Sequence, residues 1–528
     1  MATSDTKGIG KVIFSSSLGT LIEWYDFYIF GMLAKTISVQ FFPEGNDTAA
    51  LLSTLAIFAA GFLVRPFGAL VFGRLGDLIG RKSTFLLTLV LMGGSTFLIG
   101  LIPGYKAIGL AAPLLVLLLR LVQGLALGGE YGGAATYVAE HAPQGRRGYF
   151  TAWIQTTATL GLFVALGIIM LVKSSMSEAA FNAEWGGWRY PFWLSILLVG
   201  VSVYIRLKMN ESPIFSKLKR EKKTSVNPLK ESFGHKGNFK MVLLALFGAV
   251  MGQGVIWYTG QFYAQSFLEN TVKLEFMQNR EIMLWGIGLA TPFFLVFGWL
   301  SDKIGRKWIM LTGMLLGVIF YRPIFSEFIK ETNTTKWVVN KNDLKENGTN
   351  RTMKSDTSED GKKIITLIEE QTKWIYKGTL FTEKKSGKFE FPNWPSGENG
   401  GLSGTPRRYF SIDDAESSYS DIILSPHLKW KFIFLVWIMI IFVTMVYGPI
   451  AAFLVELFPT KIRYTSMSLP YHIGNGVFGG LVPFIGLLLT TSFADPLAGL
   501  WYPIAVAALC FIIGALYLSN KIDPNVND

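Results

Sequence analysis

One polar hairpin motif occurs twice in this chain, each time between two long apolar segments. The first copy, GRLGDLIGRK, spans Gly73–Lys82, and the second, GWLSDKIGRK, spans Gly298–Lys307. Another pair of related segments surrounds Glu140 and Glu456. The members of this second pair lie further apart in the chain than the two hairpins, which indicates an insertion in the second half. Internal repeats of this kind are typical of membrane transporters built from two related halves.

The composition places most of the chain in lipid. Half of its 528 residues (50%) are hydrophobic and only 16% are charged, too few charges to cover the surface of a soluble domain. The net charge of +12 comes from Lys and Arg between apolar segments, most densely in Arg206–Lys240. That distribution is the positive-inside pattern, so nucleic acid is not needed to explain it. The single cysteine, Cys510, can form no intramolecular disulfide, and we expect neither a metal nor a cofactor.

Segments long enough to cross a bilayer recur along the whole chain. A spanning helix needs about 20 apolar residues, and twelve such segments fall into two sets of six. We therefore predict an all-α integral membrane fold of twelve transmembrane helices, with an N-terminal bundle at 1–208, a cytoplasmic linker at 209–239 and a C-terminal bundle at 240–528. We interpret the first segment as retained, not as a cleaved signal peptide. The segments lie near 13–36, 50–72, 83–102, 111–139, 150–172, 189–208, 240–265, 281–300, 308–325, 431–455, 466–490 and 499–519.

The basic loops set the expected orientation. An even number of spans puts both termini on one side, and the loops at Arg74–Lys82 and Arg206–Lys240 place that side in the cytoplasm. The insertion, 326–430, is then extracytoplasmic. Its Ile364–Ile368 run is β-like, while its Asn-, Ser- and Gly-rich tracts are typical of loops. A small folded cap and a mobile loop both remain open.

Each hairpin is a candidate conformational latch. Its aspartate can lie near the positive N-terminal end of the following helix, and its basic pair faces the anionic leaflet. The charged segments after the fourth and tenth spans supply partners that pair with the hairpins in one state and release them in another. A lone basic loop would only set topology, but the duplication favours a latch. The latch candidates are Asp77, Arg81, Glu140, Arg146, Asp302, Arg306, Glu456 and Arg463.

Acidic residues inside the spans are candidates for proton handling. A charge at mid-bilayer costs about 2.5–3.5 kcal/mol on insertion scales, so each one is a functional candidate. Glu23 and Asp26 are three residues apart on one helix face, where repulsion favours a proton on at least one of them. A permanent ion pair is the alternative for Glu23, and a His bonded to a neighbouring helix is the commoner case for His472. The proton-coupling candidates are Glu23, Asp26, Glu130 and His472.

Arginines inside or beside the spans suit an anionic substrate. The planar guanidinium matches a carboxylate through two parallel hydrogen bonds. We favour Arg65 for the substrate charge, because Arg189 begins the sixth span, where it can simply extend to the membrane surface. The substrate-binding candidates are Arg65, Arg120, Arg189, Tyr258, Gln261 and Asn475.

The duplicated hairpin resembles the signature of the major facilitator superfamily, and further motifs resemble its metabolite–proton symporter family. That resemblance implies two pseudo-symmetric six-helix bundles and alternating access coupled to proton entry. Carriers of 2-oxoglutarate, shikimate, citrate, and proline or betaine belong to this family. The Arg-x-x-Gln-Gly pattern at Arg120 is shared by members with unlike substrates, which implies a coupling or structural role. The narrower motifs are LIEWYDFY (21–28), RPFG (65–68), RLVQG (120–124), GGEYG (128–132), WRYPF (188–192), ESPIF (211–215) and YHIGNGVFGG (471–480).

The sequence therefore predicts proton-coupled symport of a small, anionic organic carboxylate. The expected partners are that substrate, protons and the lipid bilayer, with the proton gradient as the driving force and no cofactor. We expect a monomer in the plasma (inner) membrane with both termini in the cytoplasm. An osmolyte or sugar carrier, a uniporter or antiporter, a channel and a non-transporting sensor are the alternatives. An enzyme is not favoured, since no nucleophile–base pair or metal cluster stands out.

Overall fold

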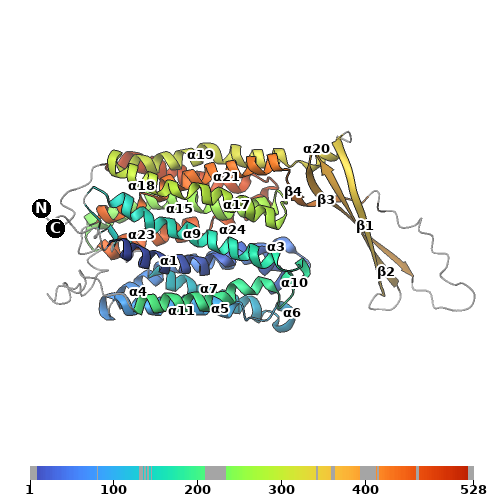
Figure 1. The fold of residues 1–528 in the computed structure, drawn as a ribbon, viewed down its shortest axis with the longest axis horizontal. Helices are drawn as coiled ribbons and strands as arrows, with labels where there is room; N and C mark the ends of the chain where they lie inside the picture. Colours follow the sequence, from blue (N-terminus) through green and yellow to red (C-terminus); the bar gives the residue numbers. More distant parts are fainter. Residues whose placement is uncertain are drawn as a thin grey trace, which may run out of the picture. The chain divides into compact units, whose positions relative to one another are not determined.

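The computed structural model describes residues 9–79, 81–129, 145–207, 234–339, 343–357, 363–392, 415–458 and 463–520, with positions 135, 138–139, 142–143 and 412. Long helices make up most of this part of the chain (Figure 1). In the first half they are α1 (Ile9–Met32), α2 (Ala34–Phe41), α3 (Asp47–Leu63), α4 (Arg65–Ile79), α5 (Arg81–Ile99), α6 (Tyr105–Ile108), α7 (Ala111–Gly128), α9 (Arg147–Ser174), α10 (Glu178–Asn182), η1 (Gly187–Arg189) and α11 (Tyr190–Leu207).

The second half begins with one helix that contains two π-helical turns. Its parts are α14 (Lys236–Ala245), η2 (Leu246–Val250), α15 (Met251–Tyr258), η3 (Thr259–Tyr263) and α16 (Ala264–Asn270). The remaining helices are α17 (Phe276–Ala290), α18 (Pro292–Ile304), α19 (Arg306–Glu331), α20 (Thr334–Val339), α21 (Pro426–Tyr447), α22 (Ile450–Leu457), α23 (Arg463–His472), η6 (Ile473–Gly479), α24 (Val482–Phe493), η7 (Ala498–Leu500) and α25 (Trp501–Tyr517).

Each of the twelve predicted apolar segments contains a helix. Among the described residues, nine helices are long and apolar enough to cross a membrane. α1, α5 and α11 cover the other three predicted segments but are not among those nine. The count of twelve membrane spans therefore stays a prediction. The nine spans are Asp47–Phe72, Ala111–Gly128, Arg147–Ser174, Lys236–Asn270, Phe276–Ile304, Arg306–Val339, Pro426–Leu457, Thr465–Phe493 and Ala498–Tyr517.

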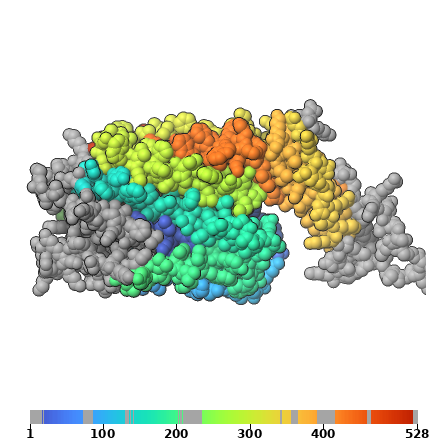
Figure 2. Space-filling view, in the orientation of Figure 1, coloured from blue at the N-terminus to red at the C-terminus, as the bar shows by residue number. Residues whose placement is uncertain are grey.

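The chain divides into two compact units. The first comprises Met1–Ser266, Met283–Ser326 and Ile433–Asp528, and the second comprises Phe267–Ile282 and Glu327–Phe432. The first unit contains all of the predicted N-terminal bundle and most helices of the C-terminal one, and in it α9 packs against α1 of the first half and α18 of the second. In Figure 2 the teal side chains of α9 lie along the boundary between the two halves. The predicted domain boundaries stay a prediction, and most of the linker lies outside the described residues.

Glycines bring α3 and α4 into direct contact with α7. A Cβ atom added at Gly124 would lie 1.8 Å from the carbonyl oxygen of Gly61, and one at Gly68 would lie 2.0 Å from that of Leu125. Only glycine lets the backbones approach this closely, as is common between membrane helices. The close approach fixes α4 and α7 against each other, and these helices carry Arg65 and Arg120.

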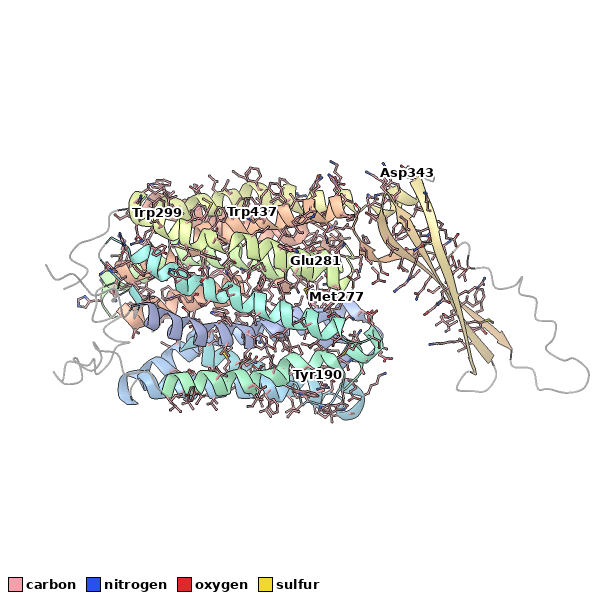
Figure 3. The ribbon with its side chains drawn as sticks, viewed as in Figure 1. Tyr190, Met277, Glu281, Trp299, Asp343 and Trp437 are labelled. Carbon is pink, nitrogen blue, oxygen red and sulfur yellow. The ribbon has the colours of Figure 1, made fainter. Side chains whose placement is uncertain are left out.

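Large aromatic side chains cover the outside of the helices. Tyr190 of α11 and Trp299 of α18, both labelled in Figure 3, are 44% and 47% exposed. Exposed aromatic rings at helix ends are typical of the membrane interface, where their apolar faces contact lipid. The surface of the first unit therefore fits a bilayer environment.

The insertion contains a β-sheet beside the short helix α20, so the fold is not all-α as predicted. β1 (Leu344–Thr357), β2 (Lys363–Tyr376), β3 (Thr379–Pro392) and β4 (Ser417–Ile423) form an antiparallel sheet in the order β1-β2-β3-β4. The β-like run Ile364–Ile368 falls in β2 as the sequence indicated. Trp337 of α20 stacks on Tyr376 of β2, with ring centroids 5.3 Å apart. The insertion is therefore a folded module in its described part, and its position outside the cytoplasm stays a prediction.

Hydrogen bonds join β4 to the turn between α16 and α17. The backbone N–H of Ile422 donates to the carbonyl of Lys273, and the N–H of Glu275 donates to the carbonyl of Ile422. The side chain of Gln278 donates to the Leu424 carbonyl at 3.1 Å and accepts from the Leu424 N–H at 2.6 Å. A buried ion pair between Glu269 and Arg280 connects α16 to α17 beside this turn. The sheet and the turn thus form one hydrogen-bonded structure within the second unit.

We predict that Gln278→Ala opens this structure locally. The variant leaves the buried Leu424 N–H and carbonyl without their side-chain partner, at a cost of about 1–3 kcal/mol. Hydrogen–deuterium exchange of the Ser417–Leu424 peptide is expected to be about 5- to 150-fold faster than in the unmodified protein. Gln371→Ala, an exposed position on β2, is the control. Equal exchange in both variants would contradict the prediction.

Candidate substrate and coupling sites

Aromatic and polar side chains from both halves meet in the interior of the first unit. Trp257 of α15 lies 6.0 Å from Trp24 and 5.6 Å from Tyr28, both of α1, measured between ring centroids. The guanidinium carbon of Arg65 lies 5.3 Å from the Trp24 ring centroid. The positive charge of Arg65 is also close enough to interact electrostatically with the side chains of Tyr258 and His472. We call this set the central cluster, and no member is more than 7% exposed. Its members are Trp24, Tyr28, Arg65, Trp257, Tyr258 and His472, together with the buried Gln261, which follows Tyr258 on the same helix.

Arg65 is buried without an acidic partner among the described residues. Its guanidinium carbon lies 4.2 Å from the ring centroid of Phe62 and 4.5 Å from that of Phe27. Neither Nε nor Nη2 makes a hydrogen bond in the described part of the chain. A buried charge in this state is costly until an anion pairs with it. The favoured sequence candidate for the substrate charge thus lies in the central cluster with unused donors.

Arg120 is enclosed by the packing of the first half. It donates to the carbonyls of Phe27 and Phe58 at 3.4 and 3.3 Å and to Gln123 Oε1 at 2.8 Å. Its guanidinium carbon also lies 4.0 Å from the Phe27 ring centroid. Gln123 in turn donates to Thr96 at 2.7 Å. These contacts join α1, α3, α5 and α7, so Arg120 has the partners expected of a structural or coupling residue.

Arg189 also binds backbone carbonyls. It donates to Glu184, Gly100 and Ile102 at 2.5, 2.8 and 2.7 Å. Its guanidinium carbon lies 4.3 Å from the ring centroid of Trp188, and the side chain is fully buried. The side chain therefore does not extend to the membrane surface. The geometry separates Arg189 from the central cluster and makes it a clamp between the loops that precede α7 and α11.

The candidates from the second half divide in the same way. Tyr258, Gln261 and His472 belong to the central cluster, and the Gln261 amide and both His472 ring nitrogens make no hydrogen bond to a described residue. Asn475, in contrast, exchanges two hydrogen bonds with Gln253, at 3.1 and 2.9 Å. This amide pair links η6 to α15, so the side chain of Asn475 is already occupied.

Asp26 faces away from the central cluster. A Cβ atom added at Gly93 of α5 would lie 3.1 Å from Asp26 Oδ2, and Ser195 of α11 is the neighbouring hydroxyl. The residue is 1% exposed, and no Lys or Arg of the described residues lies within ion-pair distance of it. Two positions along a helix turn a side chain by about 200°, so Trp24 and Asp26 occupy opposite faces of α1. A buried carboxyl group in this place suits a proton-binding position inside the first bundle.

The second hairpin, Gly298–Lys307, lies at one end of the bundle and connects the two halves there. Arg306 binds Glu456 of α22 through two hydrogen bonds of 2.6 Å and Asp302 through one of 3.1 Å. The Asp302 carboxylate accepts hydrogen bonds from the backbone N–H groups of Gly148 and Tyr149, at 2.8 and 2.9 Å. The carboxylate thus lies at the positive N-terminal end of α9, where the helix dipole stabilises it. Three predicted latch residues therefore meet at one junction.

The other predicted residues take no part in this junction. Arg146 is exposed, and its neighbour Arg147 is the residue that lies 4.0 Å from Glu456. Glu130 and Glu140 lie outside the described residues, as do the side chains of Glu23, Asp77, Arg81 and Arg463.

Apolar side chains close the opposite end of the bundle. Ala34, Leu51 and Leu55 of the first half pack against Phe484 and Leu487 of α24 in the second. Together with the Asp302 junction, these contacts join the halves on both sides of the central cluster. In the described part of the chain the two halves are therefore in contact near both ends of the bundle.

Comparisons with known proteins place this arrangement in a family. A family model described as sugar (and other) transporter matches residues 12–231. The inner membrane metabolite transport protein YhjE of Escherichia coli K12 is 30% identical over 519 residues, which cover 97% of this chain and 94% of YhjE. The chain belongs to the major facilitator superfamily. It is a secondary transporter.

Two further matches agree with the transporter's assignment. The alpha-ketoglutarate permease of E. coli K12 is 37% identical over 326 residues, which are 62% of this transporter and 73% of the permease. A D-xylose-proton symporter structure has a TM-score of 0.62 at 14% identity and covers 97% of this transporter and 98% of its own chain. That likeness shows the two-bundle fold.

Three members of the transporter's central cluster are not among the candidates that the sequence indicates. They are Trp24, Tyr28 and Trp257. Tyr28 Oη and Trp257 Nε1 are buried without a hydrogen-bond partner among the described residues. The available signal was the spacing of Trp24 and Tyr28, which puts both rings on the helix face away from Asp26.

We predict that Arg189→Gln lowers the stability of this transporter and leaves its substrate affinity unchanged. The shorter neutral side chain loses three charged hydrogen bonds to carbonyls, so the free energy of unfolding is expected to fall by about 3 kcal/mol or more. Thermal unfolding in detergent measures the change. Arg322→Gln is the control, because Arg322 is 42% exposed and lies 3.9 Å from its acidic partner. An unchanged midpoint, or a selective rise in KM, would contradict the structural role.

Proposed function

We propose that this transporter is a proton-coupled symporter of a small organic carboxylate that works by alternating access. The observation that carries the proposal is the buried Arg65 guanidinium, whose Nε and Nη2 have no partner in the described part of the chain. An anionic substrate completes this site when the two halves close around it. The alpha-ketoglutarate permease among the relatives supports a carboxylate by its name.

Asp26 is the proposed proton carrier. An ionised carboxylate without a cation is costly in a low-dielectric interior, so this position favours binding of an exchangeable proton. Its location on the α5 and α11 side of α1 separates it from Arg65. Coupling then acts through the position of α1, which carries Asp26 on one face and Trp24 and Tyr28 on the other.

The Asp302 junction is the proposed latch at the cytoplasmic end. Its charged hydrogen bonds stabilise the state in which α9, α18 and α22 meet, and they must break for that end to open. The duplicated first hairpin carries the equivalent Asp77 and Arg81. An ungated channel has no use for such a junction, and this favours a carrier.

We predict that Arg65→Gln abolishes high-affinity substrate binding while the protein remains folded. Loss of the charged partner of a buried carboxylate costs about 2–5 kcal/mol, which corresponds to a rise of about 30-fold or more in Kd. Binding of 2-oxoglutarate, citrate, shikimate, proline, betaine and a hexose to the purified protein is measured by calorimetry. Arg322→Gln is the control. Unchanged affinity of Arg65→Gln for a transported carboxylate would contradict the proposed site.

We predict that Asp26→Asn separates substrate movement from proton movement. The amide imitates the protonated carboxyl group but releases no proton, so exchange of labelled for unlabelled substrate continues while net symport stops. Lumenal pH and counterflow are recorded in proteoliposomes, with the 82%-exposed Glu178→Gln as the control. Acidification of the lumen by Asp26→Asn at the unmodified rate would exclude Asp26 as the carrier.

We predict that Glu456→Gln opens the latch end more often. The change removes the charge that binds Arg306, and a loss of about 1.4 kcal/mol already raises the open population tenfold while that state is minor. Alkylation of a cysteine at buried Thr151 of α9 reports opening, with little background because Cys510, the chain's only cysteine, is fully buried. Glu331→Gln, which leaves Lys431 bound to Glu327, is the control. Equal alkylation rates would contradict the latch.

A further inference from the structure

We propose that the central cluster selects one chemical class of substrate: a monocarboxylic acid with an uncharged body that carries hydroxyl or carbonyl oxygens. This inference rests on the proposed function, because it takes Arg65 as the carboxylate site. It excludes two other classes of small carboxylate as good substrates, namely dicarboxylates and zwitterions with an ammonium group. The unpaired polar atoms of the cluster carry the inference.

Arg65 offers one place for a carboxylate. The unused atoms Nε and Nη2 lie on the same edge of the guanidinium plane, and this edge forms two parallel bonds with a carboxylate. The flat faces are covered by aromatic rings, with Phe62 at 4.2 Å and Phe27 at 4.5 Å from the guanidinium carbon. A single carboxylate therefore occupies the free edge of Arg65, and no second free edge remains for another carboxylate.

A second carboxylate finds no other free guanidinium edge among the described residues. Arg120 lies near Arg65, but its two Nη atoms donate to the Phe27 and Phe58 carbonyls and to Gln123, so only Nε lacks a partner and no edge is free for two parallel bonds. Arg189 binds three backbone carbonyls beside the N-terminal end of α11. A dicarboxylate would leave one charge among neutral groups, and burial of that charge is unfavourable.

The remaining unpaired atoms suit a neutral, oxygen-bearing body. Tyr28 Oη and Trp257 Nε1 come from the two halves, and their rings are 5.6 Å apart. Gln261 contributes both amide atoms and His472 both ring nitrogens. Buried donors and acceptors without partners are unfavourable, so a bound substrate gains by supplying hydroxyl or carbonyl oxygens to them. The aromatic faces between them fit a carbon skeleton.

A positively charged end fits poorly in the same place. An ammonium group usually binds to aromatic faces or to a carboxylate. Here the guanidinium of Arg65 lies over the Trp24, Phe27 and Phe62 rings and repels a second cation. Asp26 faces Gly93 on the other side of α1. No carboxylate of the described residues faces the cluster to hold an ammonium group.

Transport by the unmodified protein in proteoliposomes tests the class. The probes are shikimate, 2-oxoglutarate, glycine betaine and cyclohexenecarboxylate, which lacks the hydroxyl groups of shikimate. Lumenal acidification and labelled uptake are expected to give shikimate a kcat/KM at least about 10-fold above each other probe. Preference for 2-oxoglutarate or betaine would overturn this inference but leave proton-coupled carboxylate transport standing. Failure of every carboxylate in both assays would overturn the proposed function itself.

Two variants test the neutral contacts. Tyr28→Phe removes only a hydroxyl group and is expected to raise the KM for shikimate about 2- to 12-fold while the KM for cyclohexenecarboxylate stays unchanged. Trp257→Phe removes the indole N–H together with one ring, so it is expected to raise the KM for shikimate more than the KM for cyclohexenecarboxylate. Tyr190→Phe and Trp285→Phe are the matched controls, since Tyr190 (Figure 3) and Trp285 are exposed. An equal rise for both probes would show a packing effect and contradict the assigned hydrogen bonds. No rise for either probe would also contradict them.

Discussion

The buried charge of Arg65 is the interaction on which the interior of the bundle depends. Its guanidinium lies among aromatic rings of α1 and α3, and its charge acts on Tyr258 and His472 of the second half. No acidic group of the described residues neutralises it. In our proposal an anionic substrate fills the free edge of this side chain and contacts groups from both halves, so that its binding affects how the halves close.

Different kinds of interaction hold the halves together at the two ends of the bundle. Apolar contacts between α3 and α24 close one end and need no exact alignment of partners. Charged hydrogen bonds close the other, where Asp302 binds the N-terminus of α9 and Arg306 binds Glu456. Charged hydrogen bonds require a narrow geometry, so a small displacement of α18 weakens several at once. This difference supports the proposal that the hairpin end is the latch.

The three arginines show how far residue type can carry a prediction. In the sequence Arg65, Arg120 and Arg189 are equally suited to an anion, and only position and family pattern separate them. In the structure Arg120 and Arg189 each donate to backbone carbonyls and keep one nitrogen without a partner, while Arg65 has both Nε and Nη2, a whole guanidinium edge, unpaired. Asn475 gives a similar lesson, because Gln253 occupies it from a helix more than two hundred residues away in the chain. Sequence spacing within one helix does not reveal such partners.

The sequence alone determined the membrane class, the helical segments, the duplicated halves and the place of the insertion. These properties follow from hydrophobic length, charge distribution and internal repetition, which are local or periodic features of the chain. Only the tertiary structure decided which polar side chains remain unpaired, because a side chain's hydrogen bonds are settled by helices that pack beside it from distant parts of the chain. It also decided that the insertion forms a sheet joined to the α16–α17 turn, since strand pairing depends on contacts between segments that the sequence separates.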